Sequence, residues 1–376
     1  MMTKYTIVAY TPQEFNHASN VQTGLFELER QGYVKVKVRT YFAKQLGKTI
    51  VSNTGEITQT QQAHPKTSFY KFIDGKSGGS IMFAIDLYDL ANEFSTVAFQ
   101  KCDLVFKRNY ESRYVSCLPE TLKGKVFKFG LAFGVNSQAM RRDVAFLLGG
   151  VLGSLHANLK LDRLLLQRLK KTYHIQRNEW QFVKRARELQ QFEGFQEAKS
   201  KHILFQTRCF PHENSLDVKQ IHEQRYQLIK LLKTRYPNNF KGGFVPSPLA
   251  IAKYSDALSS LPSEPHAYLE EVKNSRIVIY TRGLANSPAW KLAEYLSQGK
   301  VIIAEPLTAE LPVPLVHGKE VLFFKDHKDL VRQITLVLSD ESLMGELSRN
   351  ARTYFETQVH PVVNMRRVLG LVSEKL

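Results

Sequence analysis

Apolar and polar positions in the first third of the chain alternate between the periods typical of strands and of helices. The run YTIVAY predicts a strand, SNVQTGLFELERQG predicts a helix that begins at Ser19 or Asn20 and ends at Gly32, and YVKVKVRTYF predicts a second strand. A β-α-β unit is therefore expected at the start of the chain. The next segment, KTIVSNTGEITQT, predicts a hairpin that turns around residues 53–55.

Further apolar runs follow, each interrupted by glycine or by a polar turn. They are SFYKFID, IMFAIDLYD, STVAFQKCDLVFKRNY and KVFKFGLAF, and we interpret them as strands. Strands separated by helices and by glycine-bearing loops favour a mostly parallel sheet. Ligands of such sheets bind at the carboxyl ends of the strands.

The same alternation begins again in the second half. KHILFQTRCF predicts a new first strand, DVKQIHEQRYQLIKLLKTRYP a long helix, and HAYLEEVKNSRIVIYT a helix that leads into another strand. EVLFFKD, KDLVRQITLVLSD and ESLMGELSRNARTYFETQVH complete this half, and Pro361 precedes a last helix. We therefore expect two α/β domains, at 1–195 and 200–360, and a helix at 361–376.

The stretch NSPAWKLAEYLSQGKVIIAEP in the second half carries the clearest local signals. Asn286 and Ser287 are good helix caps and Pro288 suits the first helical position, so a helix is expected directly after the strand SRIVIYT. The backbone N–H groups at such a helix start attract phosphate. Ser287, Lys291 and Glu294 would share one face of this helix, a spacing that also fits an ordinary cap with an exposed ion pair.

The formal net charge of +17 is densest in the middle of the chain. Residues 158–201 contain 11 basic and 5 acidic residues, with leucines and aromatics at helical spacing. This basic helical segment, 158–200, is placed in the first domain. It fits either a solvated helical face or a contact with an anionic partner, such as a membrane surface, an acidic polysaccharide or a nucleic acid.

The cysteines and the apolar runs bear on the compartment. The three cysteines lie far apart, so neither a disulfide framework nor a zinc site is indicated, and a reducing compartment fits best. The start of the chain has no apolar region of the signal-peptide kind. VAFLLGGVLGSLHANL is shorter than the roughly 20 residues of a membrane-spanning helix and is expected to be a buried helix. We expect a cytoplasmic protein, with peripheral attachment to the inner face of the membrane as an option.

The run AWKLAEYLSQGKVIIAEPLTAELP, followed by GKEVLFFKDHKDLVRQITLVLSDESLMGELSRNAR, resembles the C-terminal domain of glycosyltransferases of the GT-B architecture, including the exostosin-like and family-four types. The resemblance extends over 200–360 in the order of elements. It implies two Rossmann-like domains with a cleft between them: an N-terminal domain for the acceptor and a C-terminal domain for the nucleotide sugar. It also implies a last helix that crosses back to the N-terminal domain, for which the break at His360–Pro361 is suitable.

The resemblance also implies roles for individual residues. Glu294 would bind the ribose of the donor, and Ser287 and Lys291 would lie near its diphosphate. The strand ILFQTRCF resembles the one that opens the donor domain, which makes Arg208 a second diphosphate ligand. Glu305 would approach the sugar.

Two further residues belong to the same candidate donor site. Arg282 ends the strand before the motif, where it could support the phosphates. Asn286 stands eight positions before Glu294, where many retaining members of the family carry a glutamate, so the stereochemistry stays open. The glycine-rich loop that many members place after the first N-terminal strand is replaced here by TPQEFNHASN.

An inverting transfer requires a general base beside the acceptor hydroxyl. Asp74, Asp86 and His17 lie near predicted strand ends and are the candidates. Each has a structural alternative: an Asp-Gly turn for Asp74, a helix cap for Asp86 and a solvated loop residue for His17. No DxD-like acidic pair follows a strand in the donor half, so we expect a transfer that needs no metal ion and no cofactor.

The sequence thus favours a glycosyltransferase that uses a nucleotide-diphosphate sugar to extend a cell-surface polysaccharide or a lipid-linked acceptor. A nucleotide-sugar epimerase of the same architecture is the alternative enzyme. The high charge, the 16 tyrosines and the 23 phenylalanines also prompt a nucleic-acid-binding protein, but no binding motif for nucleic acid is present. The base, the sugar, the acceptor and the linkage stay open.

Overall fold

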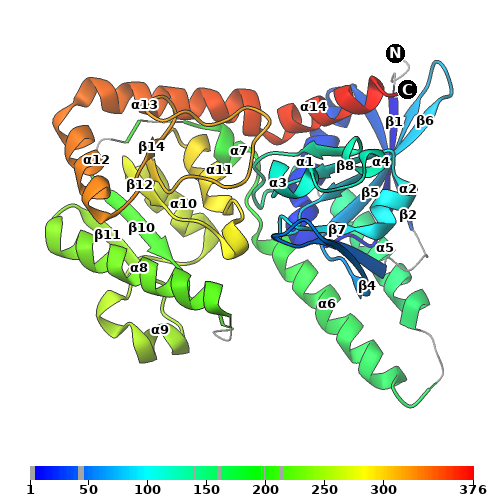
Figure 1. The fold of residues 1–376 in the computed structure, drawn as a ribbon, viewed down its shortest axis with the longest axis horizontal. Helices are drawn as coiled ribbons and strands as arrows, with labels where there is room; N and C mark the ends of the chain where they lie inside the picture. The colour runs from blue at the N-terminus through cyan, green and yellow to red at the C-terminus, as the bar shows by residue number, and fades with distance from the viewer. Residues whose placement is uncertain are drawn as a thin grey trace. The chain divides into compact units, whose positions relative to one another are not determined.

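Figure 1 shows a computed structural model of the chain, which describes residues 5–40, 46–138, 141–158, 162–195, 197–198, 200–211 and 215–376. The chain divides into two compact units. The first consists of Met1–Leu189, Ala309–Pro312 and Val359–Leu376, and the second of Gln190–Thr308 and Val313–Gln358. Each unit is built around its own sheet with helices packed on it, which confirms the expected pair of Rossmann-like α/β domains.

The first unit contains a six-stranded sheet in the order β2-β1-β5-β6-β8-β9. Its strands are β1 (Tyr5–Thr11), β2 (Val34–Thr40), β5 (Thr67–Asp74), β6 (Ser80–Asp86), β8 (Leu104–Lys107) and β9 (Val126–Lys128). All neighbours are parallel except β5, which runs antiparallel to both β1 and β6. The expectation of a mostly parallel sheet is therefore wrong at β5. Only residues 75–79 join β5 to β6, too few for the crossover that parallel strands need.

Alternate residues of the central strands face two different cores. Tyr70, Phe72 and Phe83 pack with α1 (Phe15–Arg30), α5 (Arg141–Asn158), α6 (Leu165–Arg185) and α14 (Pro361–Ser373). Phe69 and Ala84 face the opposite core. That core includes residues of α2 (Thr96–Lys101), α3 (Ser112–Val115) and α4 (Glu120–Lys123), and of a small antiparallel sheet.

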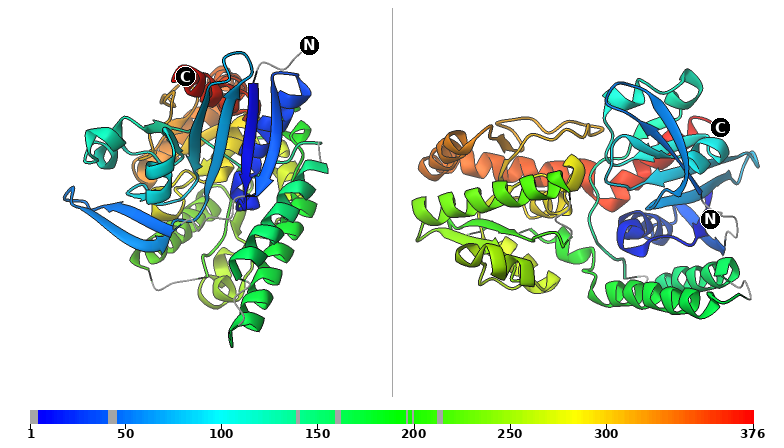
Figure 2. Two further views of the ribbon diagram at one scale, coloured as in Figure 1. Left: turned by 90° about the vertical axis from the view of Figure 1, so that its right-hand side faces the viewer. Right: turned by 60° about the horizontal axis from the view of Figure 1, so that its bottom comes forward.

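The small sheet has the order β4-β3-β7, with β3 (Leu46–Val51), β4 (Ile57–Ala63) and β7 (Glu93–Ser95). The β3-β4 pair is the hairpin predicted around residues 53–55, and it is visible in both views of Figure 2. The expected strand over STVAFQ is wrong, because these residues form the end of β7 and helix α2. The Ser95 hydroxyl accepts a hydrogen bond from the Ala98 amide at 3.2 Å and thereby caps this helix.

The last helix packs directly on the first one. Helix α14 contributes Val362, Met365 and Val368 to the core that also contains residues of α1. The contact is close at Gly24, where a Cβ atom would lie 2.4 Å from the Pro361 carbonyl oxygen and 2.6 Å from Met365 Cγ. The absence of a side chain at Gly24 therefore permits the approach of the two helices.

Helix α5 covers the run expected to be a buried helix, and the burial expectation is only partly right. Phe146 is buried, but Val144, Leu148 and Leu152 are 42%, 60% and 58% exposed. Their spacing of four residues places them along one side of α5. Within the described parts of the chain, no helix combines the length and the apolar character that crossing a membrane would require.

The second unit contains a five-stranded parallel sheet in the order β11-β10-β12-β13-β14. Its strands are β10 (Ile203–Thr207), β11 (Phe240–Phe244), β12 (Ile277–Tyr280), β13 (Val301–Ala304) and β14 (Leu322–Phe323). The central strands β10, β12 and β13 are buried along their whole length, as expected for a parallel sheet covered on both faces. Its helices are α7 (Gln190–Glu193), α8 (Leu216–Arg235), α9 (Pro248–Lys253), α10 (Pro265–Asn274), α11 (Trp290–Ser297), α12 (His327–Ser339) and α13 (Glu341–Tyr354).

Candidate functional site

Three charged residues gather at the carboxyl edge of the sheet in the second unit. Arg208 follows β10, Arg282 follows β12, and Glu305 follows β13. Because these strands are parallel neighbours, their carboxyl ends lie at one edge. The structure thus brings together three of the residues that the sequence suggested for the donor, at the edge where open α/β sheets bind ligands.

Glu305 and Arg282 are linked through the backbone. The Arg282 amide donates to Glu305 Oε2 at 2.7 Å, and the Gln224 side chain on α8 donates to the other carboxylate oxygen. The Arg282 guanidinium pairs with Asp217 in the first turn of α8, with Nη1 and Oδ1 2.5 Å apart. Both side chains of this pair are partly exposed, at 22% and 32%, so a stronger anion has access to the guanidinium.

A buried arginine holds the two strand ends in place. The Arg225 guanidinium donates to the carbonyl oxygen of Arg208 at 3.0 Å and to that of Arg282 at 3.1 Å. Burial lowers the pKa of Arg225 to about 10, and the negative charge of Glu305 opposes this shift. Arg225 therefore stays charged at neutral pH and contributes positive charge beneath the edge.

Gln224, Arg225 and Asp217 were not singled out from the sequence, although one signal was present. Val218, Ile221, Leu228 and Leu232 are buried at helical spacing along α8. Arg225 occupies the position of the same series between Ile221 and Leu228. A charged residue within an apolar stripe needs hydrogen-bond partners when it is buried. The position of Arg225 among these apolar residues thus indicates that its guanidinium forms hydrogen bonds within the unit.

The turn before α11 differs from the prediction. The expected cap at Asn286 or Ser287, with Pro288 in the first helical position, is wrong, because the helix begins at Trp290 and no side chain caps it. Ala285 and Asn286 have φ angles of 53° and 58°, a left-handed conformation that does not lead into a right-handed helix. Asn286 is therefore part of a tight turn.

Ser287 closes this turn through its backbone. The Gly283 amide donates to the Ser287 carbonyl oxygen, and the Ser287 amide donates to the Leu284 carbonyl oxygen, each at 3.0 Å. Ser287 is 4% exposed and precedes α11, so it does not share a helical face with Lys291 and Glu294 as expected.

Lys291 and Glu294 lie one turn apart on α11 and face the interior. Lys291 Nζ donates to the carbonyl oxygen of Gln206 in β10 and to the Tyr268 hydroxyl at 3.2 Å, and it lies 4.4 Å from the centre of the Tyr268 ring. Glu294 is only 4% exposed. Lys291 therefore joins α11 to the carboxyl end of β10, and the ribose role of Glu294 stays a prediction.

In the first unit, the carboxyl edge is formed by the ends of β1, β2, β6 and β8. Asp86 ends β6 and has no exposed surface. Its Oδ2 lies 3.1 Å from Lys107 Nζ and 3.0 Å from His64 Nε2, and its Oδ1 accepts from the Tyr88 amide at 2.9 Å. Burial acts to raise the pKa of Asp86, but Lys107 and then His64 hold it well below its usual range.

Asp86 is thus a buried structural carboxylate. A general base must reach the acceptor hydroxyl, and Asp86 offers no surface to it. The structure therefore argues against Asp86 as the catalytic base. Its contacts with Lys107 and His64 instead tie β6 to β8 and to the segment before β5.

Asp74 lies at the opposite edge of this sheet. It pairs with Tyr5 at the start of β1, whereas Asp86 pairs with Lys107 at the end of β8. Its carboxylate accepts from the Lys76 amide at 3.0 Å and from the Ser77 hydroxyl at 2.9 Å within the β5-β6 turn. The structure does not bring Asp74 together with the other two candidates, and its contacts are those of an Asp-Gly turn.

His17 lies in the first turn of α1, directly after the carboxyl end of β1. Its Nδ1 is 3.1 Å from Glu14 Oε1, and the two side chains are 16% and 38% exposed. Burial acts to raise the pKa of Glu14, but the contact with His17 and its charge lower it. An imidazole held by a carboxylate is the arrangement of a general base with its positioning group.

A second charged pair lies at this edge. Asp89 accepts from Lys66 Nζ at 2.6 Å and from the Arg108 guanidinium. Burial acts to raise the pKa of Asp89, but Arg108 and then Lys66 lower it, and the charge of His17 adds to this effect. The carboxyl edge of the first unit therefore combines His17 with basic side chains. Lys66 and Glu14 were not singled out from the sequence, since neither lies in a recognisable motif.

Comparison with known proteins bears on the second unit. Residues 238–370, from just before β11 to within α14, match a protein family described as glycosyl transferase-like. This part of the chain is similar to glycosyl transferases. The resemblance to GT-B glycosyltransferases is thereby confirmed for the stretch of sequence that carried it.

The fold of the chain has distant neighbours among solved structures. Sucrose-phosphate synthase from Thermosynechococcus elongatus is 12% identical, with 98% of this chain and 99% of that one covered and a TM-score of 0.41. HepE from Anabaena, in complex with UDP-glucose, is 9% identical, with 98% and 100% covered and a TM-score of 0.37. The C-terminal domain of a group 1 glycosyl transferase from Francisella tularensis is 12% identical, with 43% and 86% covered and a TM-score of 0.31. No curated protein matches the sequence of the chain.

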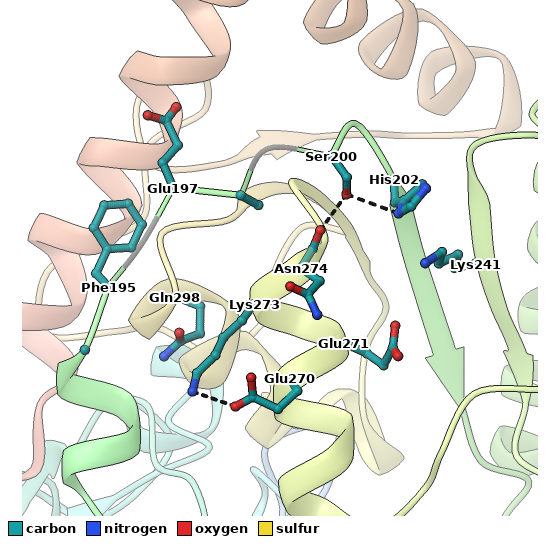
Figure 3. A pocket seen from close by; sticks show the side chains of 12 residues that line it. Phe195, Glu197, Ser200, His202, Lys241, Glu270, Glu271, Lys273, Asn274 and Gln298 are labelled. Atoms are coloured by element: carbon teal, nitrogen blue, oxygen red, sulfur yellow. Dashed lines mark hydrogen bonds and ion pairs between the residues drawn. The ribbon is translucent and has the colours of Figure 1, made fainter.

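The second unit also has a cavity of about 740 Å³, shown in Figure 3. His202 precedes β10, Asn274 precedes β12 and Gln298 precedes β13, so this cavity lies at the amino ends of the strands. Its polar walls are already bonded internally: the Ser200 hydroxyl donates to the Asn274 carbonyl oxygen at 2.5 Å, and Lys273 pairs with Glu270 at 2.7 Å (Figure 3). The cavity is thus distinct from the candidate donor edge of the second unit.

Across the described ranges, His, Cys, Asp and Glu side chains form no group of three or more that could hold a metal ion. The independence of a metal ion, expected from the sequence, stays a prediction.

Proposed function

We propose that the chain transfers a sugar from a nucleoside-diphosphate sugar to a hydroxyl group of a glycan or a lipid-linked acceptor, in the synthesis of a cell-surface polysaccharide. The observation that carries this proposal is the pair of arginines, Arg208 and Arg282, at the carboxyl edge of a sheet in which β11, β12, β13 and β14 lie within the match to glycosyl transferases. Guanidinium groups bind phosphate through two parallel hydrogen bonds, which suits a diphosphate leaving group.

The arginines are accessible to such a ligand. Arg208 is exposed and forms no ion pair with any residue that the structure describes, and Arg282 is paired with the partly exposed Asp217. Arg225 adds a positive charge below them. These groups would neutralise the charge that develops on the diphosphate as the bond to the sugar breaks, without a metal ion.

His17 is the candidate base that the structure supports best, because Asp86 is inaccessible and Asp74 lies at the opposite edge. With Nδ1 directed at Glu14, Nε2 would take the proton of the acceptor hydroxyl. The hydroxyl oxygen would then form a bond to the anomeric carbon while the bond from that carbon to the diphosphate oxygen breaks. Glu14 would act as a positioning residue that stabilises the imidazolium.

A thermal-shift screen of nucleoside diphosphates and nucleotide sugars tests the proposal. A ligand that binds only the folded state stabilises it by about 2.7 kcal/mol at a hundred times its Kd, which raises the melting temperature. We expect one nucleoside diphosphate and its sugar derivatives to raise the melting temperature of the wild-type chain. Failure of the whole panel would contradict the proposal.

The product distinguishes a transferase from an epimerase. The ligand selected by the screen is incubated with the chain, first alone and then with a mixture of glycan and lipid-linked acceptors. Product that forms only with an acceptor supports the transferase. An altered sugar nucleotide that forms without any acceptor would support the epimerase.

A further inference from the structure

One face of helix α6 exposes apolar side chains at a constant interval. Leu166, Tyr173 and Trp180 are 79%, 63% and 44% exposed, and each is seven residues from the next. A spacing of seven residues is close to two helical turns, so the three side chains lie along one face. Thr172 and Val183 of the same helix are buried on another side.

Basic side chains are interleaved with this row. Lys170, Arg177 and Lys184 are exposed, and each follows one of the apolar residues by four positions. Residues four apart are neighbours on a helix surface, so the six residues form one stripe of alternating apolar and basic groups. We call these six residues the α6 stripe. Lys184 Nζ lies 5.6 Å from the centre of the Trp180 ring, which shows the two kinds of side chain side by side.

The α6 stripe is available for a partner of opposite charge. Its three basic residues form no ion pair with any residue in the described ranges. The surrounding segment is also basic, with 11 Lys and Arg against 5 Asp and Glu at 158–201. A solvated helix face would not require Leu, Tyr and Trp at regular exposed positions, because exposing them to water is unfavourable.

We propose that the α6 stripe docks the chain onto a lipid bilayer that carries anionic headgroups. In a helix that lies in the plane of the interface, Leu166, Tyr173 and Trp180 would enter the boundary between headgroups and acyl chains. Tyrosine and tryptophan favour this boundary because each has an apolar ring and a polar tip. Lys170, Arg177 and Lys184 would meet the lipid phosphates. This proposal concerns the attachment of the chain and holds independently of the reaction it catalyses.

Co-sedimentation with vesicles tests the charge complementarity. The full chain is mixed with phosphatidylcholine vesicles that contain or lack phosphatidylglycerol. We expect binding only to the anionic vesicles, and about a hundredfold weaker binding when Lys170→Gln, Arg177→Gln and Lys184→Gln are combined. The matched control combines Lys76→Gln, Lys328→Gln and Arg349→Gln, which replace basic residues that are also exposed but lie on separate elements, and it should bind like the wild type. Equal losses in the two variants would overturn the assignment to the α6 stripe.

The apolar residues have their own test. Leu166→Ser, Tyr173→Ser and Trp180→Ser together should weaken binding to anionic vesicles at low and high salt alike, since apolar burial is not screened. Only Trp180 and Trp290 contribute tryptophan fluorescence, so insertion should shift the emission to shorter wavelength in the wild type and not in Trp180→Phe, which still binds. Vesicle binding without this shift would overturn the insertion of Trp180.

Two controls separate membrane docking from a loss of folding or nucleotide binding and from binding of nucleic acid. The stripe variants should keep the melting temperature of the wild type and its response to the nucleotide found by the screen, because the stripe residues are exposed and outside the candidate donor edge. Binding of duplex DNA in place of vesicles, lost in the same variants, would overturn the proposal in favour of a nucleic-acid surface.

Discussion

The guanidinium of Arg282 is paired with the carboxylate of Asp217, 2.5 Å away, at the carboxyl edge of the second sheet. An ion pair that is partly exposed exchanges readily for a stronger anion. Asp217 also accepts from the Ala285 amide at 2.9 Å, so the same carboxylate fixes the left-handed turn before α11. The proposed diphosphate site therefore holds its arginine in place by an internal carboxylate.

Arg282→Ala should weaken binding of the nucleoside diphosphate. A hydrogen bond to a charged group contributes about 1.5–3 kcal/mol, so we expect a loss of roughly tenfold to a hundredfold in affinity, measured by calorimetry. Arg332→Ala is the matched control, because the exposed Arg332 pairs with Asp329 on α12 of the same unit. If both variants bind like the wild type, Arg282 does not contact the ligand.

Arg225→Leu should destabilise the fold. The substitution leaves the carbonyl oxygens of Arg208 and Arg282 without their donor and removes a positive charge near Glu305. A buried acceptor that loses its donor costs about 1–3 kcal/mol, which denaturant unfolding would detect. Arg235→Leu, an exposed residue of the same helix, should change stability by less than about 0.5 kcal/mol. Similar unfolding curves for both variants would contradict the role of Arg225.

Gly24→Ala should weaken the packing of α14 on α1. The new methyl group would overlap the Pro361 carbonyl oxygen and Met365. Overpacking of this kind costs about 1–3 kcal/mol, measured as the free energy of unfolding. Gly370→Ala in α14 is the control, because no atom lies within 4 Å of its added Cβ, and it should stabilise the helix slightly. Equal changes in the free energy of unfolding for Gly24→Ala and Gly370→Ala would contradict the close packing of α14 on α1 at Gly24.

Lys107→Met should change the pH dependence of stability. A carboxylate with a lowered pKa stabilises the fold above its unfolded value, about 3.9, and that contribution is lost as the pH falls through the folded pKa. Asp86 behaves in this way in the wild type. Without Lys107, burial would raise the pKa of Asp86, so the cost of the substitution should be about 3–5 kcal/mol at neutral pH and shrink as the pH is lowered toward about 4.

The control for this effect is Lys123→Met, which breaks an exposed ion pair with Glu120. Its effect on stability should be small at every pH. Chemical unfolding of the wild type, Lys107→Met and Lys123→Met across the pH range measures the effect of each substitution on the free energy of unfolding. A constant penalty for Lys107→Met would show that Asp86 is not the group that responds.

His17→Gln should lower the rate of sugar transfer with little change in donor affinity. Loss of a general base costs about a hundredfold to ten-thousandfold in rate. Glu14→Gln should reduce the rate less, because it changes only the group that orients His17. His327→Gln, in the first position of α12, is the control and should leave the rate unchanged. An unaltered rate in His17→Gln would exclude it as the base.

Sequence patterns were sufficient for the overall architecture. The apolar runs around Ile203, Ile277 and Val301 are parallel-strand cores that recur between helices, so these three strands of the second unit could be predicted. Strand β11 and helix α9 were not predicted. The β3-β4 hairpin was predictable from its turn residues. Local patterns did not decide whether the strand ending at Asp74 runs parallel or antiparallel to its neighbours in the sheet. The short glycine-bearing turn after it is nevertheless typical of a hairpin.

The candidate site was only partly predictable, because its contacts come from residues distant in sequence. Arg208, Arg282 and Glu305 follow strands, and parallel pairing brings such residues together. The capping residues Asn286 and Ser287 gave a wrong helix start, since the left-handed turn is fixed by Asp217, about seventy positions earlier. Arg225 links the segments that follow β10 and β12, and this role is visible only in the folded structure, where the Arg208 and Arg282 carbonyl oxygens lie close together.

The most direct measurement is a calorimetric titration of the wild-type chain and of Arg208→Ala combined with Glu294→Ala, using the nucleoside diphosphate selected by the thermal-shift screen. We predict one binding site in the wild type and no measurable binding in the double variant, which should still unfold cooperatively. Equal affinity in the two proteins would contradict the placement of the donor, and absence of binding for every nucleotide and nucleotide sugar would contradict the proposed activity.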